Sequence, residues 1–96
     1  MLTGKQRAYL RSLAAKEAVI LTIGKAGITD AVVAEAQDAL RARELIKGKV
    51  LETSLLTPRE ASDALCELCG ADGVQCIGNV FSLYRPADKP RIVLPK

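Results

Sequence analysis

Apolar residues recur along this 96-residue chain with two spacings, one typical of helices and one typical of strands. Spacings of three, four and seven residues predict three helices, because they place apolar side chains on one helical face. These helices run from a cap at Thr3 to about Ala15, from a cap at Thr29 to about Ala42, and from the Thr57-Pro58 turn to a stop at Gly70. Short apolar stretches predict four strands, at residues 18–23, 44–53, 74–78 and 80–85, the last two joined by a turn at Gly78-Asn79.

This order of elements, α-β-α-β-α-β-β, predicts an α/β fold, a two-layer sandwich with a four-stranded mixed sheet. Right-handed crossovers favour a parallel first pair of strands, and the hairpin makes the last pair antiparallel. The unbroken apolarity of residues 18–23 predicts a strand that is covered on both faces. Residues 1–96 are expected to form one domain, in which residues 86–96 are a proline-containing tail whose segment 91–94 could add a short edge contact.

Positive charge is concentrated in the N-terminal half of the chain. The net charge of the whole chain is +3, but residues 1–49 carry +4 and residues 50–96 carry −1. This half contains Arg7, Arg11, Lys25, Arg41, Arg43, Lys47 and Lys49, several of which we expect to face solvent. Arg7 and Arg11 share an outward helical face, and Lys47 and Lys49 share one face of a strand. A charge run is usually only a solvated face. These residues, however, belong to elements that a compact fold brings side by side, which favours a surface for a phosphate backbone.

A lysine between two glycines follows the first strand, in the stretch VILTIGKAGITDAVV at residues 19–33. Gly24 and Gly27 let the backbone turn sharply, and the following helix start offers unpaired N–H groups. With the mobile charge of Lys25, these features suit a phosphate group. The alternative is a tight strand-to-helix turn with an exposed lysine, because G-x-x-G is short and common. The sequence contains neither the P-loop pattern nor the dinucleotide-binding pattern.

The cysteines have the spacing of a metal or redox site but not its context. Cys66 and Cys69 form a C-x-x-C, yet a structural zinc site needs four Cys or His ligands, and the chain has three cysteines and no histidine. The pair also lies at the C-terminal end of a predicted helix, where the dipole opposes a thiolate. We therefore interpret both residues, and Cys76 in its apolar strand, as small buried side chains. Three cysteines make a poor disulfide framework, which favours the cytoplasm.

Composition argues against several classes of function. Without histidine the commonest general base is missing, and Glu60 and Asp63 fit a solvated helix face better than a catalytic pair. We expect no enzyme activity, no metal and no cofactor. Only three residues are aromatic, so a broad base-stacking platform is not expected. No apolar run approaches the roughly 18 residues of a membrane span, and the N-terminus lacks the apolar centre of a secretory signal.

Five segments of the chain resemble the YhbY family of small bacterial RNA-binding proteins, whose module is also called the CRM domain and recurs in plant chloroplast intron-splicing factors. The segments are LTGKQRAYLRSLA, IGKAGIT, RELIKGKV, VQCIGNVFSLYRP and KPRIVLP, and they occur in the right order from Leu2 to Pro95. The resemblance implies a fold similar to the C-terminal domain of bacterial translation initiation factor three, with a G-x-x-G loop reminiscent of KH domains. It also implies association with precursors of the large ribosomal subunit.

The resemblance also assigns roles by position. Gly24, Lys25, Ala26 and Gly27 match the family's loop, Lys5 and Arg7 match its basic first helix, and Lys47 and Lys49 match its second strand, while Arg11 joins the set from its place beside Arg7. Two positions depart from the family. Gly48 stands where a β-branched residue is usual, and this glycine either weakens the strand or lets another group approach closely. Ala26 leaves the loop with one charge instead of two.

Our leading hypothesis is a monomeric, cytoplasmic RNA-binding protein that contacts the ribosomal RNA backbone during large-subunit assembly, with no DNA or membrane partner. It rests mostly on the resemblance. One alternative is a protein-interaction module that docks on a ribosomal protein or assembly factor through the sheet or the tail. Another is a thiol-dependent enzyme that uses Cys66 and Cys69.

Overall fold

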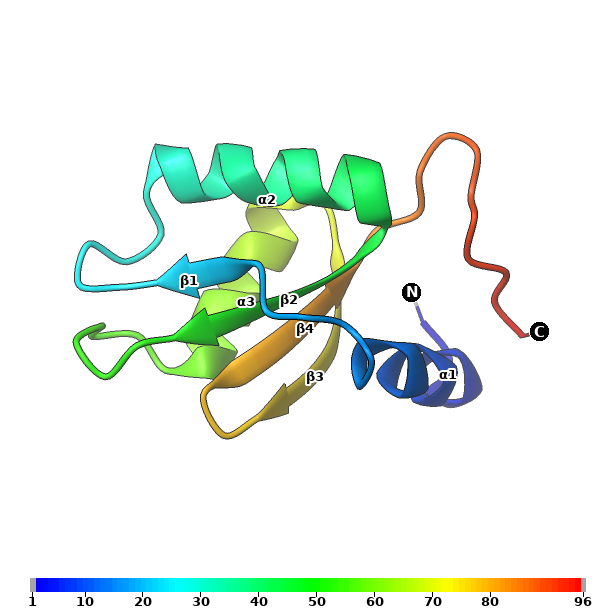
Figure 1. The fold of residues 1–96 in the computed structure, drawn as a ribbon, viewed down its shortest axis with the longest axis horizontal. Helices are drawn as coiled ribbons and strands as arrows, with labels where there is room; N and C mark the ends of the chain where they lie inside the picture. The colour runs from blue at the N-terminus through cyan, green and yellow to red at the C-terminus, as the bar shows by residue number, and fades with distance from the viewer. Residues whose placement is uncertain (1, 96) are drawn as a thin grey trace.

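This computed structural model describes residues 2–95, which contain three helices and four strands. In chain order they are α1 (Gly4–Ala14), β1 (Leu21–Ile23), α2 (Asp30–Arg43), β2 (Leu45–Val50), α3 (Pro58–Cys69), β3 (Asp72–Ile77) and β4 (Val80–Tyr84). Their order is the predicted one, and Figure 1 shows them as a sheet with helices packed against it. None of these helices has the length and apolarity needed to cross a membrane.

The four strands form one mixed sheet, as predicted. Their spatial order is β1-β2-β4-β3, so β1 and β3 are the edges and β2 and β4 are the central pair. β1 and β2 run parallel, whereas β4 is antiparallel to both β2 and β3. The predicted turn at Gly78-Asn79 joins β3 to β4, and Gly78 has a φ of +59° there, which favours glycine.

Helices α2 and α3 cover one face of the sheet and enclose the main hydrophobic core (Figure 1). Its buried side chains are Leu21, Ile23, Ala36, Leu40, Ile46, Val50, Ala61, Leu65, Cys69, Phe81 and Leu83. Complete burial of a large aliphatic or aromatic side chain contributes roughly 1.5–3 kcal/mol. This layer therefore supplies most of the apolar stabilisation of the fold.

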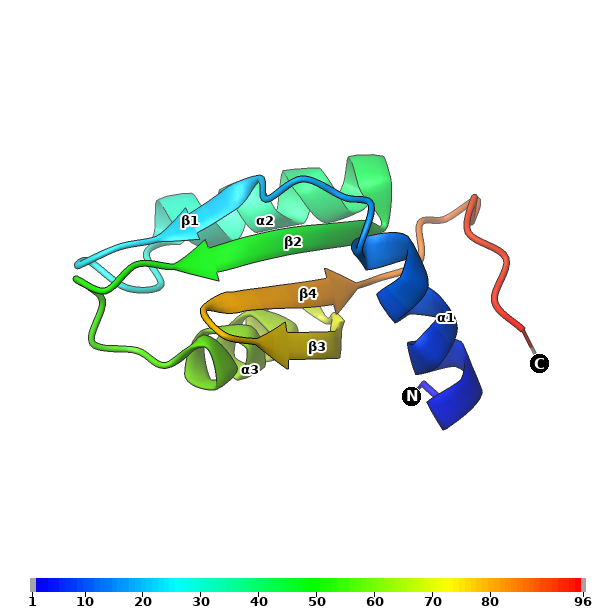
Figure 2. The ribbon, with the colours of Figure 1, turned by 60° about the horizontal axis from the view of Figure 1, so that its bottom comes forward.

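Helix α1 lies on the opposite face, across one end of the sheet (Figure 2). A second, smaller cluster joins it to the strands through Leu2, Leu10, Ala14, Leu45, Val74 and Tyr84. Beyond this cluster, no helix of residues 2–95 covers that face (Figure 2). The two-layer sandwich thus has a partial third layer at one end only.

The first strand is shorter and more exposed than the sequence predicts. β1 contains only three residues, and Thr22 is exposed between the buried Leu21 and Ile23. The prediction that this strand is covered on both faces is wrong, because α1 lies over the other end of the sheet. Similarly, β2 ends at Val50, and the chain turns at residues 52–53 where the sequence predicted strand.

Threonine side chains cap all three helices, as their sequence positions predict. Thr3 and Thr57 form reciprocal capping boxes with Gln6 and Glu60, and the hydroxyl of Thr29 caps α2. A cap of this kind typically contributes about 1 kcal/mol. The N–H of Thr57 donates to the Glu60 carboxylate and lowers the pKa of Glu60. Glu60 therefore stabilises a helix end, which agrees with its interpretation as a non-catalytic residue.

Gly48 in the centre of β2 allows an aromatic ring to pack directly on the backbone. A Cβ atom at this position would lie 2.3 Å from Cζ and 2.7 Å from Cε2 of Phe81, the residue opposite it on β4. Phe81 is 1% exposed and belongs to the main core, so its ring has no free space into which it can move. Of the two roles that the sequence left open for Gly48, close approach of another group is the one observed.

Glu44, between α2 and β2, is a buried carboxylate that holds the tail. It is 1% exposed, and its φ of +66° lies in the region that normally favours glycine. Its carboxylate accepts backbone N–H groups from Ala87 at 3.0 Å, Arg91 at 2.7 Å and Ile92 at 3.2 Å. Burial raises the pKa of Glu44, but these three hydrogen bonds and the charge of Arg91 outweigh burial, so the net shift is downward.

The tail is ordered by packing and not by strand pairing. Residues 85–95 contain no strand, so the short edge contact that the sequence left open for residues 91–94 does not form. Instead Ile92 and Leu94 pack against the cluster under α1, and the side-chain amide of Gln6 donates to the carbonyl of Pro95 at 3.1 Å. Glu44 and α1 together fix the path of the tail.

A Gly48→Ala substitution is expected to destabilise the protein by about 1–3 kcal/mol, because the new methyl group overlaps the Phe81 ring. Urea unfolding measures this difference. Gly4→Ala is the matched control, since a Cβ at Gly4 meets no atom within 4 Å. A smaller side chain in Gly48→Ala, Phe81→Leu should recover part of the loss. If Gly48→Ala unfolds at the native urea concentration, the close-packing argument fails.

Glu44→Gln is expected to lower the free energy of unfolding at neutral pH by about 1–3 kcal/mol, because the amide replaces one acceptor oxygen with a donor. The pKa of Glu44 is lower in the folded state, so its contribution is complete above the ordinary value of about 4.5 and is lost as the pH falls through the folded value.

Urea unfolding between pH 7 and pH 3 tests both statements. The difference in stability between native protein and Glu44→Gln should shrink as the solution becomes acidic. A difference that stays constant over this range would contradict the proposed role of the charged carboxylate.

Candidate nucleic-acid interface

The loop at residues 24–27 is a tight turn between β1 and α2. The N–H of Gly27 donates to the carbonyl of Gly24 at 3.0 Å, and Gly27 has a φ of +72°, a conformation that favours glycine. Lys25 and Ala26 are exposed at its tip. Within residues 2–95 their N–H groups donate to no backbone carbonyl. The loop therefore presents a cation and two N–H groups to solvent, a combination suited to a phosphate oxygen.

A neighbouring segment, residues 51–56, supports this loop from behind. The N–H of Leu51 donates to the carbonyl of Ile23 at 2.9 Å, which ties the exits of β1 and β2 together. A Cβ at Gly24 would contact Leu51, and one at Gly27 would contact Leu56. The two segments lie side by side at one end of the sheet in Figures 1 and 2. The loop is thus backed by apolar side chains.

Strand register places the two predicted lysines on the face of the sheet that α2 and α3 do not cover. Ile46 and Val50 point into the main core, so Lys47 and Lys49 point to the opposite side. Lys49 is exposed and Lys47 is half-buried. We call the residues of this side that do not belong to the cluster under α1 the open face: Thr22, Lys47, Lys49, Gln75, Ile77, Val80 and Ser82, of which Ser82 is buried.

The open face consists of two rows of side chains that cross the strands. Thr22, Lys49, Val80 and Ile77 are successive partners in one row, and Lys47, Ser82 and Gln75 are partners in the next. Sequence reasoning found the lysines of these rows but missed Thr22, Gln75 and Ser82. A polar residue between two apolar ones in LTI and FSL was the available signal for Thr22 and Ser82.

The basic residues of α1 lie at the far end of the open face from the loop (Figure 2). Lys5 and Arg11 are exposed. Arg7 was expected to point outward, but it is half-buried and its Nε donates to the carbonyl of Gly73 at 3.2 Å. This hydrogen bond ties α1 to the edge strand β3, so Arg7 has a structural role besides its charge.

The predicted site residues therefore do not converge on one point. The 24–27 loop stands at one end of the sheet, α1 stands at the other, and Lys47 and Lys49 lie between them on β2 (Figure 2). Arg41 and Arg43, in contrast, belong to the last turn of α2, on the other side of the sheet. The fold therefore arranges Lys25, Lys49, Lys47 and the cations of α1 along the open face. We call this arrangement the basic strip.

The remaining side chains on this surface favour contact with phosphates over base stacking. Of the three aromatic residues, Phe81 and Tyr84 are buried and Tyr9 is 40% exposed. Leu55, beside the loop, is 95% exposed and was missed by sequence reasoning, since an isolated leucine in a polar turn carries no recognisable pattern. Tyr9 on α1 is thus the one exposed aromatic ring among residues 2–95.

The cysteines remain poor candidates for chemistry. Burial raises the pKa of the Cys66 and Cys69 thiols, which opposes formation of a reactive thiolate. Cys69 is buried as predicted and Cys66 is half-buried, but Cys76 is exposed, so its expected burial is wrong. Cys76 lies near the end of the edge strand β3, where both it and Ile77 are exposed.

Comparisons with known proteins agree with one another. A family model described as the CRS1 / YhbY (CRM) domain matches residues 2–85. The chain is 38% identical over 96 residues to the "Probable RNA-binding protein YqeI" of Bacillus subtilis, covering 99% of this chain and 100% of that protein. It is 36% identical over 95 residues to the "RNA-binding protein" of Haemophilus influenzae, covering 99% of this chain and 96% of the relative.

A solved structure extends the agreement to three dimensions. The solution structure of the hypothetical protein SAV1595 from Staphylococcus aureus superimposes with a TM-score of 0.83 at 41% identity, covering 99% of this chain and 100% of the other. The resemblance carried by the five sequence segments is thereby confirmed. This chain belongs to the CRS1 / YhbY (CRM) domain family.

Proposed function

We propose that this protein binds RNA through its 24–27 loop and its open face, and that it does so during assembly of the large ribosomal subunit. The observation that carries the proposal is the position of Lys47 and Lys49. They lie on a face that most of the helical layer leaves uncovered, between the loop at one end and α1 at the other. A basic strip of this kind suits a run of backbone phosphates.

The proposed contact is with the RNA backbone and is led by the shape of the RNA. Lys25 and the N–H groups of the loop meet one phosphate group, while Lys49, Lys47 and the cations of α1 neutralise its neighbours along the strand. If about four phosphates are neutralised, log K should fall with log salt with a slope near −3, at roughly −0.7 per phosphate of a single strand. Base identity contributes little, since the strip offers few groups that read base edges.

The relatives support the RNA-binding part of this proposal. The names of the Bacillus and Haemophilus proteins describe RNA binding, and neither describes catalysis, which agrees with the expectation of a non-enzymatic protein. The ribosomal part rests on the family resemblance, which implies precursors of the large subunit. We place the activity in the cytoplasm, where three free cysteines are tolerated, and assign it to a monomer.

The alternative of a protein-docking module receives less support from the tail. Its apolar residues Ile92 and Leu94 are already packed against the cluster under α1, and Val93 alone among its large apolar side chains is strongly exposed, at 79%. A tail used as a docking peptide would have to give up those contacts and the hydrogen bonds to Glu44.

The double substitution Lys25→Asp, Ala26→Asp is expected to weaken binding to a large-subunit ribosomal RNA fragment about tenfold or more, because it places two carboxylates where a phosphate would sit. The slope of log K against log salt should also become less negative by about 0.7 for each lost phosphate contact. Titration of the RNA at several salt concentrations measures both quantities.

Ala15→Asp, Lys16→Asp is the matched control, since it changes the net charge equally at two exposed residues outside the proposed site. Unfolding curves establish that both variants fold. If the loop variant keeps the native affinity and the native slope of log K against log salt, residues 24–27 serve only as a turn and do not contact RNA. A slope near zero for the native protein would overturn the proposal as a whole.

A further inference from the structure

A basic hollow lies at the opposite end of the molecule from the 24–27 loop. It forms where the tail leaves β4 beside the last turn of α2, at the right of Figure 1. Arg41, Arg85, Lys89 and Arg91 line it, with Asp88 as the one carboxylate in its wall. Clefts lined by one sign of charge concentrate the electrostatic field and attract ions of the other sign. We call this hollow the tail pocket.

Glu44 holds the backbone of the tail pocket's wall in place through hydrogen bonds to main-chain N–H groups. The carboxylate is saturated by the backbone N–H groups of Ala87, Arg91 and Ile92. The side chains of Lys89 and Arg91 stay exposed, and neither forms an ion pair with any carboxylate of residues 2–95. The fold thus fixes the backbone beneath two exposed cations, of which Arg91 also acts on the Glu44 carboxylate through its charge.

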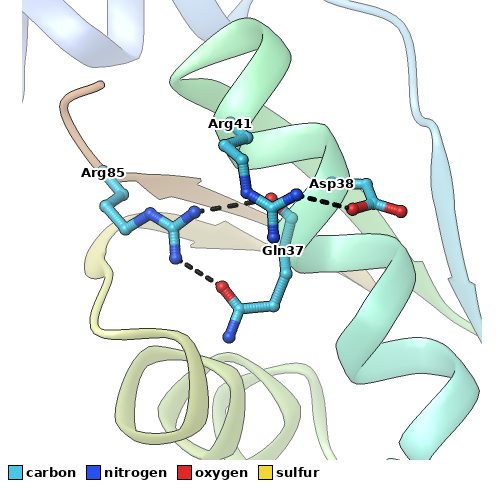
Figure 3. Close-up of polar contacts among 4 residues, drawn as sticks. All are labelled: Gln37, Asp38, Arg41 and Arg85. Carbon is cyan, nitrogen blue, oxygen red and sulfur yellow. Dashed lines mark hydrogen bonds and ion pairs between the residues drawn. The ribbon is translucent and has the colours of Figure 1, made fainter. Parts of the chain in front are cut away.

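Arg85, drawn in Figure 3, adds a half-buried positive charge to the lining of the tail pocket. Its guanidinium donates to the side chain and the backbone carbonyl of Gln37 and, at 2.7 Å, to the carbonyl of Cys69 at the end of α3. All of these acceptors are neutral. Arg41, which Figure 3 shows nearby on α2, pairs with Asp38 at 3.0 Å on an exposed surface, where such a pair contributes little to stability.

We infer that the tail pocket binds a phosphate group of the same RNA, as a second contact separate from the 24–27 loop. Arginine-rich surroundings suit a phosphate because the guanidinium donates two parallel hydrogen bonds to its oxygens. A docked protein segment would call for a large apolar anchor. The apolar lining residues here are the buried Leu40, the exposed Pro86 and the half-buried Ala87, and the long exposed side chains are charged. Lys89 and Arg91 lie beyond the residues 2–85 that the family model matches, in the segment KPRIVLP that resembles the family. The inference rests on the proposed RNA-binding function.

The distance between the two sites makes the second contact depend on RNA length. The molecule is 39 Å long, and the loop and the tail pocket lie toward opposite ends of it (Figure 1). At roughly 3.4 Å per nucleotide along one stacked strand, about eleven nucleotides are needed to cover that length. An RNA of about five nucleotides reaches only one site, whereas a longer RNA reaches both.

The test compares Lys89→Gln, Arg91→Gln with the control Lys16→Gln, Arg59→Gln, which removes the same charge from exposed residues elsewhere. Both variants and the native protein are titrated with single-stranded RNAs of about five and about thirty nucleotides. We expect the tail variant to lose about five- to thirtyfold in affinity for the long RNA and much less for the short one. Its salt slope on the long RNA should be less negative by about 0.7, the contribution of one phosphate contact of a single strand.

Equal affinity of the tail variant and the control for the long RNA would overturn the inference. A second result would also overturn it: the native protein and the control bind an oligoglutamate peptide, the tail variant does not, and the tail variant keeps native affinity for RNA. The occupant of the tail pocket would then be a protein segment. Both results leave the proposed function intact. That function fails separately, if the native protein binds neither RNA in a salt-dependent manner.

Discussion

The packing of Phe81 across Gly48 sets the geometry of the central strand pair, on which both sides of the sheet depend. The ring occupies the space of a Cβ atom, so it fills the core under α2 and α3 directly against the backbone of β2. Because side chains alternate along a strand, a glycine that faces the core places the residues on either side of it, Lys47 and Lys49, on the other face. The same contact that completes the core therefore turns two lysines toward solvent. The proposed interface follows from how the centre of the sheet is packed.

A second constraint acts at the other end of the molecule, where a buried charge organises the tail. Glu44 adopts a backbone conformation that normally favours glycine and carries a carboxylate where burial opposes its charge. Three backbone N–H groups of the tail compensate for both costs, and the tail in turn packs Ile92 and Leu94 under α1. The chain after β4 is thereby part of the folded structure. Its cations have a fixed backbone beneath them, which is the basis for assigning them a ligand of their own.

The elements of the fold could be predicted from the sequence because their signals are local. Threonine caps, the stop at Gly70 and the Gly78-Asn79 turn lie where the sequence places them. The exposure of individual side chains was harder to predict, because it depends on which part of the sheet each helix covers. The exposure of Thr22 and Cys76 is set by the limited reach of the helices, and the inward position of Arg7 depends on a carbonyl 66 residues away in the chain. Glu44 gave no signal, since its partners lie in the tail. The loop and the strand lysines were identifiable by resemblance, but their separation along the open face is a property of the tertiary structure.

The central claim is that the open face and the 24–27 loop together form the surface that meets RNA. The most direct test is to record amide chemical shifts of the isotope-labelled native protein during titration with a ribosomal RNA fragment. The account predicts that amides of residues 24–27 and of Lys47 and Lys49 shift together, while those on the outer side of α3 stay unchanged. Shifts confined to α2 and α3, with the loop and β2 unaffected, would contradict it.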